Sequence, residues 1–161
     1  MIDAAEFKGH IVRLDHTAHA VWSIEAAAKL YRDVLGGVGV YGRSIDDEGF
    51  RFEQFQYPNG SKIELLEPLR EDSFVASFLR SRGEGLHHLT FVVVGLEELV
   101  AKLKRGGYRI VGEDYRDPAW REAFISPRSA HGTIVQLAES LPAQGGEATE
   151  AVTNFPSGES M

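Results

Sequence analysis

The chain has 161 residues, of which 43% are hydrophobic and 25% charged, a composition typical of an ordinary soluble domain. Its formal net charge is −7 without any basic block, which argues against a nucleic-acid-binding surface. The lack of cysteine excludes disulfides, thiolate metal ligands and a cysteine nucleophile. We find no signal peptide and no apolar run long enough to cross a bilayer, so we expect a cytoplasmic protein that binds no membrane.

A strand and a helix are expected first. After a lead-in of residues 1–10, residues 11–21 read as a strand, and Ser23 follows as a suitable helix N-cap. Apolar residues then recur at helical spacing until Gly36 and Gly37 end the run. The first helix therefore lies between these limits.

A hairpin is expected next. The segments FRFEQFQY (50–57) and KIELLE (62–67) flank PNGS, and Asn-Gly between two such segments is the strongest short hairpin signal. If the hairpin closes around Asn59 and Gly60, Phe55 lies opposite Glu64, with Glu53 diagonally across on the same face. This register points Glu53 and Glu64 in the same direction, whereas a three-residue loop would shift the register and turn Glu53 outward.

The second half of the chain repeats this mixture of elements. The expected elements are a short helix at 72–82 capped by Asp72 or Ser73, a strand at 86–94, a helix from 96 that stops at Gly106, and strands at 108–113, 122–126 and 133–139. Residues 141–161 are rich in Gly, Pro, Ser and Glu and have no apolar periodicity, so we expect a disordered tail.

An internal repeat relates the two halves. The segment NGSKIELLE (59–67) matches HGTIVQLAE (131–139) position by position, which defines a constant repeat offset. The same offset places His16 on His88 and Glu64 on Gln136, so the spacing within each half's pair is identical. Because neighbouring strand residues face opposite sides, His88 and its neighbour in the His-His pair cannot share one role.

The repeat predicts a metal site. Each module supplies one imidazole from its first strand and one oxygen-bearing side chain from its last, and two-fold pseudo-symmetry would bring His16, Glu64, His88 and Gln136 together at the module interface. Two histidines and two oxygen ligands suit one divalent transition metal, such as cobalt, manganese, nickel, zinc or iron, with room for water or substrate. The alternative is that both histidines are hydrogen-bonded core residues, but the matched spacing favours the metal.

At this point the segments LDHTAHAV, KLYRDVLGG, KIELLEPL and DSFVASFLRSRGEGLHHLTFVV resemble the vicinal oxygen chelate superfamily, and most of all its methylmalonyl-CoA epimerases. The resemblance covers roughly residues 12–139. It implies an α+β fold in which two tandem βαβββ modules form one pseudo-symmetric curved sheet. The implied domain spans 1–140, with modules 11–68 and 85–140, a linking helix at 69–84, and the tail at 141–161. The family's metal ligands fall on the same four residues that the spacing selects.

The resemblance also implies a reaction. Members of the epimerase family abstract a proton next to a carbonyl with the help of a divalent metal, so we expect an isomerase or epimerase acting on an acyl-CoA such as methylmalonyl-CoA. Glu53 and Glu64 are the candidate catalytic carboxylates. The family pattern has Glu where this chain has Gln136, and an amide can bind a metal but cannot take a proton at neutral pH. The oligomeric state stays open, with a homodimer as one alternative.

Other functions of the same superfamily stay open. They are a glyoxalase-type lyase, an iron-dependent dioxygenase that uses His16, His88 and Glu64 with open positions on the iron, and a binding or resistance protein that sequesters a small molecule without metal. The remaining polar candidates lie on the opposite strand face, in a turn or in the lead-in, and are expected to be structural or solvated: His10, Asp15, His19, His87 and His131.

Overall fold

A computed structural model describes residues 4–140 of the chain. In chain order the elements are η1 (Ala4–Phe7), β1 (Ile11–Ala20), α1 (Ile24–Ala28), η2 (Lys29–Val34), β2 (Val38–Ile45), β3 (Phe50–Gln56), β4 (Lys62–Pro68), α2 (Phe74–Arg82), β5 (Gly85–Val93), α3 (Leu96–Arg105), β6 (Ile110–Asp117), β7 (Trp120–Ile125) and β8 (Ile134–Glu139). The strands are hydrogen-bonded in the order β2-β3-β4-β1-β5-β8-β7-β6. The predicted α+β class with two successive βαβββ runs is confirmed, and the predicted tail at 141–161 lies outside the described residues.

The described chain divides into two compact units. We call residues 15–88 the first unit, and residues 4–14 together with 89–140 the second unit. The boundaries fall inside β1 and inside β5, so each unit contains part of both strands. The predicted division into modules 11–68 and 85–140 joined by a linking segment stays a prediction.

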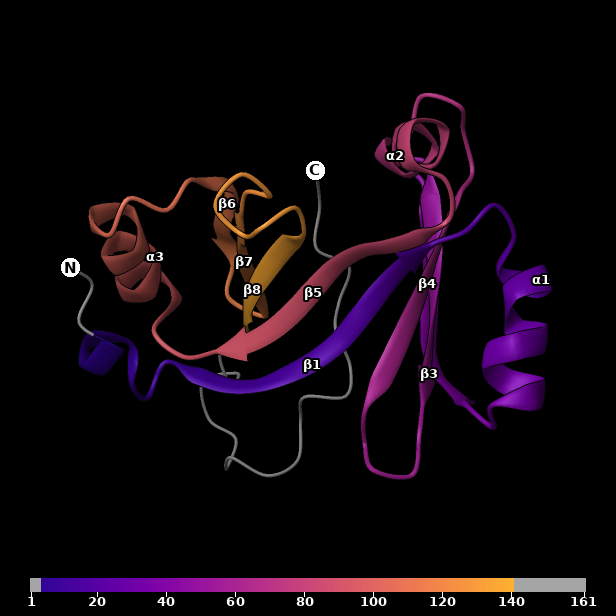
Figure 1. Cartoon of the computed structure of the whole chain (residues 1–161), viewed down its shortest axis with the longest axis horizontal. Helices are drawn as coiled ribbons and strands as arrows, with labels where there is room; N and C mark the ends of the chain where they lie inside the picture. Colours follow the sequence, from indigo (N-terminus) through magenta and orange to yellow (C-terminus); the bar gives the residue numbers. More distant parts are fainter. Residues whose placement is uncertain (1–3, 141–161) are drawn as a thin grey trace. The chain divides into compact units, whose positions relative to one another are not determined.

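In the first unit, β4 pairs in parallel with β1 and antiparallel with β3, and β3 pairs antiparallel with β2 (Figure 1). Helices α1 and α2 both contact β4. Ser23 caps α1 as predicted, because its side chain accepts a hydrogen bond from the Ala26 backbone N–H. The run continues as the π-helical turn η2, in which the Leu35 N–H donates to the Leu30 carbonyl oxygen at 2.9 Å. Ser73 caps α2 in the same way as Ser23 caps α1.

The hairpin between β3 and β4 closes through three residues. The Gly60 N–H donates to the Tyr57 carbonyl at 2.8 Å, and the Tyr57 N–H donates to the Ser61 carbonyl at 2.9 Å. Gly60 has φ +82°, the left-handed conformation that favours glycine. A type I turn followed by a left-handed residue is the usual form of a three-residue hairpin loop. The predicted closure around Asn59 and Gly60 is therefore wrong by one residue.

The corrected register moves Glu53 to the other side of the sheet. Gln54 lies opposite Glu64, while Glu53 lies opposite Leu65. Residues that are paired across two strands share a face and neighbours along a strand do not, so Glu53 and Glu64 face opposite sides. The sequence argument that pointed Glu53 toward the metal is overturned, because a one-residue slip reverses every side chain of the strand.

Strand β2 was not located from the sequence. Seven of its eight residues are exposed or half-buried, so it lacks the alternation that marks a strand with one buried face. Gly42 lets β2 approach β3 closely, since a Cβ at this position would lie 2.8 Å from the Phe52 carbonyl oxygen. The two strands pair antiparallel with a register shift between Gly39 and Tyr41.

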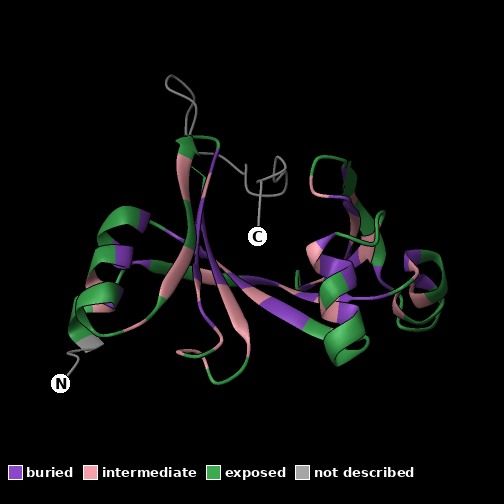
Figure 2. Cartoon of the chain, turned by 90° about the horizontal axis from the view of Figure 1, so that it is seen from above, coloured by how far each residue is buried: buried purple, intermediate pink, exposed green. Residues whose placement is uncertain are grey.

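In the second unit, β7 pairs antiparallel with both β6 and β8. Helix α3 buries one side and exposes the other (Figure 2), and its buried residues are those that the spacing predicts: Leu96, Leu99, Val100 and Leu103. They pack with β-strand residues that include Ala123 and Leu137 in one apolar cluster. None of the helices in residues 4–140 is both long and apolar enough to cross a membrane.

Matching hydrogen bonds in the two units support the repeat. The Glu67 carboxylate accepts from the Ile24 backbone N–H at 2.6 Å, at the start of α1. The Glu139 carboxylate accepts from the Gly95 backbone N–H at 2.5 Å, at the start of α3. These carboxylates are related by the repeat offset and both satisfy a helix N-terminus, where free N–H groups and the helix dipole favour a negative charge.

Candidate metal centre

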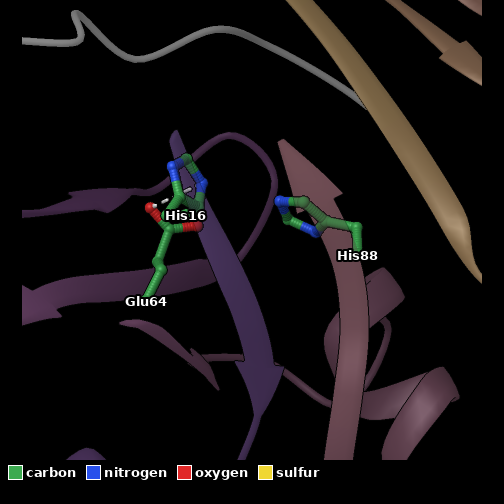
Figure 3. A group of neighbouring side chains, drawn as sticks. All are labelled: His16, Glu64 and His88. Atoms are coloured by element: carbon green, nitrogen blue, oxygen red, sulfur yellow. Dashed lines mark ion pairs between the residues drawn. The ribbon is translucent and has the colours of Figure 1, made fainter. Parts of the chain in front are cut away.

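Three of the predicted ligands meet in the first unit. His16 comes from β1, Glu64 from β4 and His88 from β5, and each offers one ligand atom that lies within 4.8 Å of the other two. The His16 Nε2 atom lies 3.7 Å from Glu64 Oε2, and the His16 and His88 rings have centroids 5.9 Å apart. Figure 3 shows the three side chains directed toward one another. All three are buried.

The pairing of β1 with β4 explains how residues so far apart in sequence come together. The strands run parallel, with His16 opposite Lys62 and Ala18 opposite Glu64. His16 and Ala18 share a face because they are two residues apart, so Glu64 lies diagonally across from His16 on that face. A parallel connection needs a long crossover, and here α1, η2 and the β2–β3 hairpin supply it.

The His16 ring is held by a buried ion pair. Its Nδ1 lies 2.9 Å from Asp15 Oδ2, and the same oxygen lies 2.7 Å from Lys62 Nζ. Burial alone would raise the pKa of Asp15, but the hydrogen bonds to His16 and Lys62 and the charge of the lysine lower that pKa to about 2. A carboxylate on Nδ1 fixes the orientation of the ring and leaves Nε2 for a ligand, as is usual for metal-binding histidines.

The His88 ring is held by its neighbour. The Nδ1 atoms of His87 and His88 are 2.8 Å apart, so one of them donates the hydrogen bond and the other accepts it. Burial lowers the pKa of His88 well below its ordinary value, which favours the neutral form that binds metals. His87 itself contacts the rings of Phe74 and Phe78 on α2, so the predicted opposite orientation of the two histidines is confirmed.

Glu64 is held by an amide that sequence reasoning missed. Gln54, which is 1% exposed, donates from Nε2 to Glu64 Oε2 at 2.7 Å. The buried Oε1 atom of the same amide has no hydrogen-bond partner among the described residues. Two imidazoles, one carboxylate and an adjacent unsatisfied acceptor fit a divalent transition metal with a bound water or substrate.

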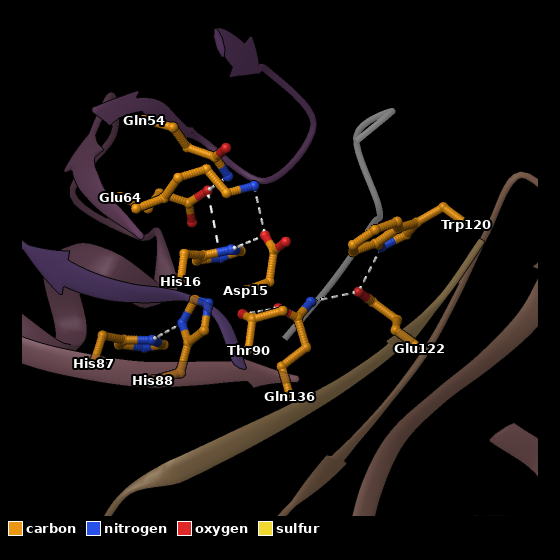
Figure 4. A network of polar contacts seen from close by, with 11 residues as sticks. Asp15, His16, Gln54, Glu64, His87, His88, Thr90, Trp120, Glu122 and Gln136 are labelled. Carbon is orange, nitrogen blue, oxygen red and sulfur yellow. Dashed lines mark hydrogen bonds and ion pairs between the residues drawn. The ribbon is translucent and has the colours of Figure 1, made fainter. Parts of the chain in front are cut away.

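Gln136 lies in the second unit within its own polar network (Figure 4). Its Oε1 accepts from the Thr90 hydroxyl at 2.6 Å, and its Nε2 donates to Glu122 Oε2 at 2.8 Å. Trp120 Nε1 donates to the same Glu122 oxygen at 2.9 Å. The fourth ligand therefore stays a prediction from the repeat.

The sequence profile of the Glyoxalase/Bleomycin resistance protein/Dioxygenase superfamily matches residues 15–124 of the chain. The chain belongs to this superfamily. The match includes His16, Glu64 and His88, so the superfamily resemblance seen in the sequence is confirmed for the segment that holds the candidate centre.

The chain is also similar in sequence and structure to individual proteins. An uncharacterised Bacillus subtilis protein, YqjC, is 36% identical over 79% of this chain and 91% of its own length. The ethylmalonyl-CoA/methylmalonyl-CoA epimerase of Cereibacter sphaeroides is 34% identical over 79% of this chain and 97% of its own length. The crystal structure of methylmalonyl-CoA epimerase from Mycobacterium tuberculosis superposes with a TM-score of 0.74 at 34% identity, over 84% of this chain and 92% of that chain.

The other polar residues predicted to be structural or solvated fall into both groups. His10 Nδ1 contacts the Val94 carbonyl oxygen at 2.8 Å, and Asp15 supports His16, so both are structural. His19 is half-buried on the face of β1 opposite to His16. His131 is exposed in the turn before β8 and has φ +53°.

Removing the lysine of the buried ion pair should destabilise this superfamily member. In Lys62→Met the Asp15 carboxylate remains buried without its cation, and loss of one partner of a buried pair typically costs about 3–5 kcal/mol. We expect a fall of that size in the free energy of unfolding, measured by urea denaturation. Arg32→Met is the control, because its ion pair with Asp33 is exposed and solvent screens such a pair, so its loss should change the free energy of unfolding little. Equal effects of the two substitutions would contradict the expectation.

Proposed function

We propose that the protein is a metal-dependent epimerase that moves the proton next to the thioester carbonyl of an acyl-CoA such as methylmalonyl-CoA. His16, Glu64 and His88 would hold one divalent ion, with Gln136 as the fourth ligand that the repeat predicts. The observation that carries the proposal is the buried His-Glu-His group, in which every member has a separate partner that orients it. The 34% identity to an epimerase over 97% of that enzyme's length supports the choice of reaction.

The chemistry follows from what the group can do. A bound divalent ion supplies a Lewis acid that stabilises the enolate formed when a carbonyl compound loses its α-proton. The chain's own contribution is to hold two imidazoles in fixed orientations and to place a carboxylate beside them. Asp15 and His87 perform the first task through their contacts with His16 and His88.

Glu64 is the carboxylate that remains to accept the proton. Glu53 faces the other side of the sheet, so it no longer competes for this role. A carboxylate has two oxygens with four lone pairs, which allows it to serve as a ligand and as a proton acceptor. Gln54 fixes one of these oxygens by donating to Oε2.

The proposal predicts metal-dependent exchange of the substrate's α-proton. Protein loaded with Co²⁺ and incubated with methylmalonyl-CoA in D₂O should incorporate deuterium, and chiral analysis of the recovered thioester should show inversion. Protein stripped by a chelator should lose the activity by at least about 10²-fold, a lower bound on what a metal and a positioned base contribute. Restoring Co²⁺ should restore exchange. If the metal-loaded protein exchanges no proton of any acyl-CoA tested, the epimerase function is wrong.

A further inference from the structure

The second unit contains a chain of four polar side chains, of which the proposed function uses only Gln136. It runs from Thr90 on β5 through Gln136 on β8 to Glu122 and Trp120 on β7. All four side chains are buried, and Glu122 is only 3% exposed. Burying an ionisable carboxylate is costly unless donors satisfy it, and here the Trp120 indole and the Gln136 amide do so at one oxygen.

This chain of contacts selects one orientation of the Gln136 amide. A carboxylate only accepts hydrogen bonds, so Glu122 requires the nitrogen of the amide to face it. The Thr90 hydroxyl donates to the amide oxygen at the other end. A carbonyl oxygen has two lone pairs, of which Thr90 occupies one. The second lone pair can then serve a ligand, which an amide with its oxygen and nitrogen exchanged could not offer.

The first unit contains a comparable hydrogen bond with the residue types exchanged, although Gln54 lies directly opposite Glu64 whereas Glu122 lies diagonally across from Gln136. There the carboxylate of Glu64 occupies the predicted ligand position and the amide of Gln54 donates to it at 2.7 Å from the neighbouring strand. In the second unit the amide of Gln136 occupies the ligand position and the carboxylate of Glu122 accepts from it at 2.8 Å, again from the neighbouring strand. Each unit therefore pairs one Glu with one Gln through one buried hydrogen bond.

We infer that Glu122 is a positioning residue for Gln136, which turns the amide so that its oxygen is the atom offered as a ligand. The inference rests on the proposed function, which makes position 136 a metal ligand. Glu122 also explains why this chain has an amide at position 136, where the epimerase pattern has a carboxylate. The negative charge is carried by Glu122 on the neighbouring strand β7. Glu122 acts through Gln136 and is given no part in proton transfer.

A set of exchanged residues tests the inference. Glu122→Leu leaves the amide nitrogen without its acceptor, so Co²⁺ binding by the metal-free protein should weaken by about 10–100-fold, the usual effect of removing a partner behind a metal ligand. In the double variant Glu122→Gln/Gln136→Glu, the new amide at position 122 can donate to the new carboxylate at position 136, as Gln54 donates to Glu64 in the first unit. The double variant should bind Co²⁺ at least as tightly as the unaltered protein, in a calorimetric titration.

Thermal unfolding without metal provides the second readout. In Gln136→Glu alone, two buried carboxylates face each other and neither can donate a hydrogen bond. The melting temperature of this variant should therefore lie below those of the unaltered protein and the double variant. Glu98→Gln is the control, because it removes an exposed carboxylate of α3 in the same unit and should change neither readout.

The outcomes separate the inference from the proposed function. If Glu122→Leu is folded and binds Co²⁺ as tightly as the unaltered protein, Glu122 is not a positioning residue and the proposed function stands. If the unaltered protein binds no Co²⁺, the proposed function fails, and the melting temperatures alone decide whether Glu122 orients Gln136. If the double variant recovers neither the melting temperature nor the Co²⁺ affinity that Gln136→Glu loses, the inference is overturned.

Discussion

Replacing either His16 or His88 with alanine should abolish the binding of about one divalent ion per chain. Each substitution removes one imidazole from the candidate His-Glu-His group, and no other histidine in residues 4–140 belongs to that group. Elemental analysis after dialysis against Co²⁺-free buffer should then show well below about 0.1 ion per chain, since losing a ligand costs more than the 10–100-fold typical of a supporting residue.

His19→Ala is the matched control for this experiment. His19 lies three residues after His16 on the same strand but faces the other side, so its variant should retain the metal. His87→Ala should retain less metal than His19→Ala but more than His88→Ala. Strand alternation keeps His87 out of the group, but its Nδ1 contacts that of His88. Metal retained by His88→Ala and lost by His19→Ala would contradict the assignment of the faces.

The sequence predicted the three-residue group because repetition and strand alternation are both long-range constraints. The spacing from His16 to Glu64 recurs in the second half, and a repeated spacing reflects a repeated topology rather than local chance. Alternation showed that the two neighbouring histidines cannot share one role, and the repeat offset selected His88. The contacts of His87 with Phe74 and Phe78 agree with that choice. These arguments needed no knowledge of loop conformation.

The hairpin register could not be obtained in the same way. Asn59-Gly60 signals a turn, yet a two-residue and a three-residue loop both use glycine in a left-handed conformation. Pro58 was the overlooked signal, because proline favours the second position of a type I turn, and the Tyr57–Gly60 turn has it there. A slip of one residue was enough to misplace Glu53 and to hide Gln54, whose buried amide contacts Glu64.

Strand alternation also fails to predict contacts between the side chains of neighbouring residues. Asp15 precedes His16 and His87 precedes His88, so alternation assigns each to the side away from the ligands. Their side chains nevertheless reach the Nδ1 atom of the next residue, at 2.9 Å and 2.8 Å. Both candidate ligand histidines are thus oriented by the residue before them, and the repeat offset relates these two supporting residues to each other.

Glu64→Gln should separate the two roles proposed for this carboxylate. An amide oxygen can still bind a divalent ion, so we expect the variant to retain Co²⁺. An amide cannot accept a proton at neutral pH, so exchange of the α-proton of methylmalonyl-CoA with D₂O should fall by about 10²–10⁴-fold, the usual contribution of a positioned acid or base. The Gln54 amide can rotate and accept from the new side chain through the oxygen that now lacks a donor.

Glu53→Gln is the control, since it makes the same chemical change on the adjacent strand but on the opposite face. It should leave both Co²⁺ content and deuterium incorporation at the level of the unaltered protein. Mass spectrometry of the recovered thioester, with metal content measured on the same samples, distinguishes the outcomes. A Glu64→Gln protein that keeps its metal and still exchanges the proton at the original rate would show that another group is the base. Loss of exchange in Glu53→Gln would return that role to the residue first selected from the sequence, acting from the face that the corrected register assigns to it.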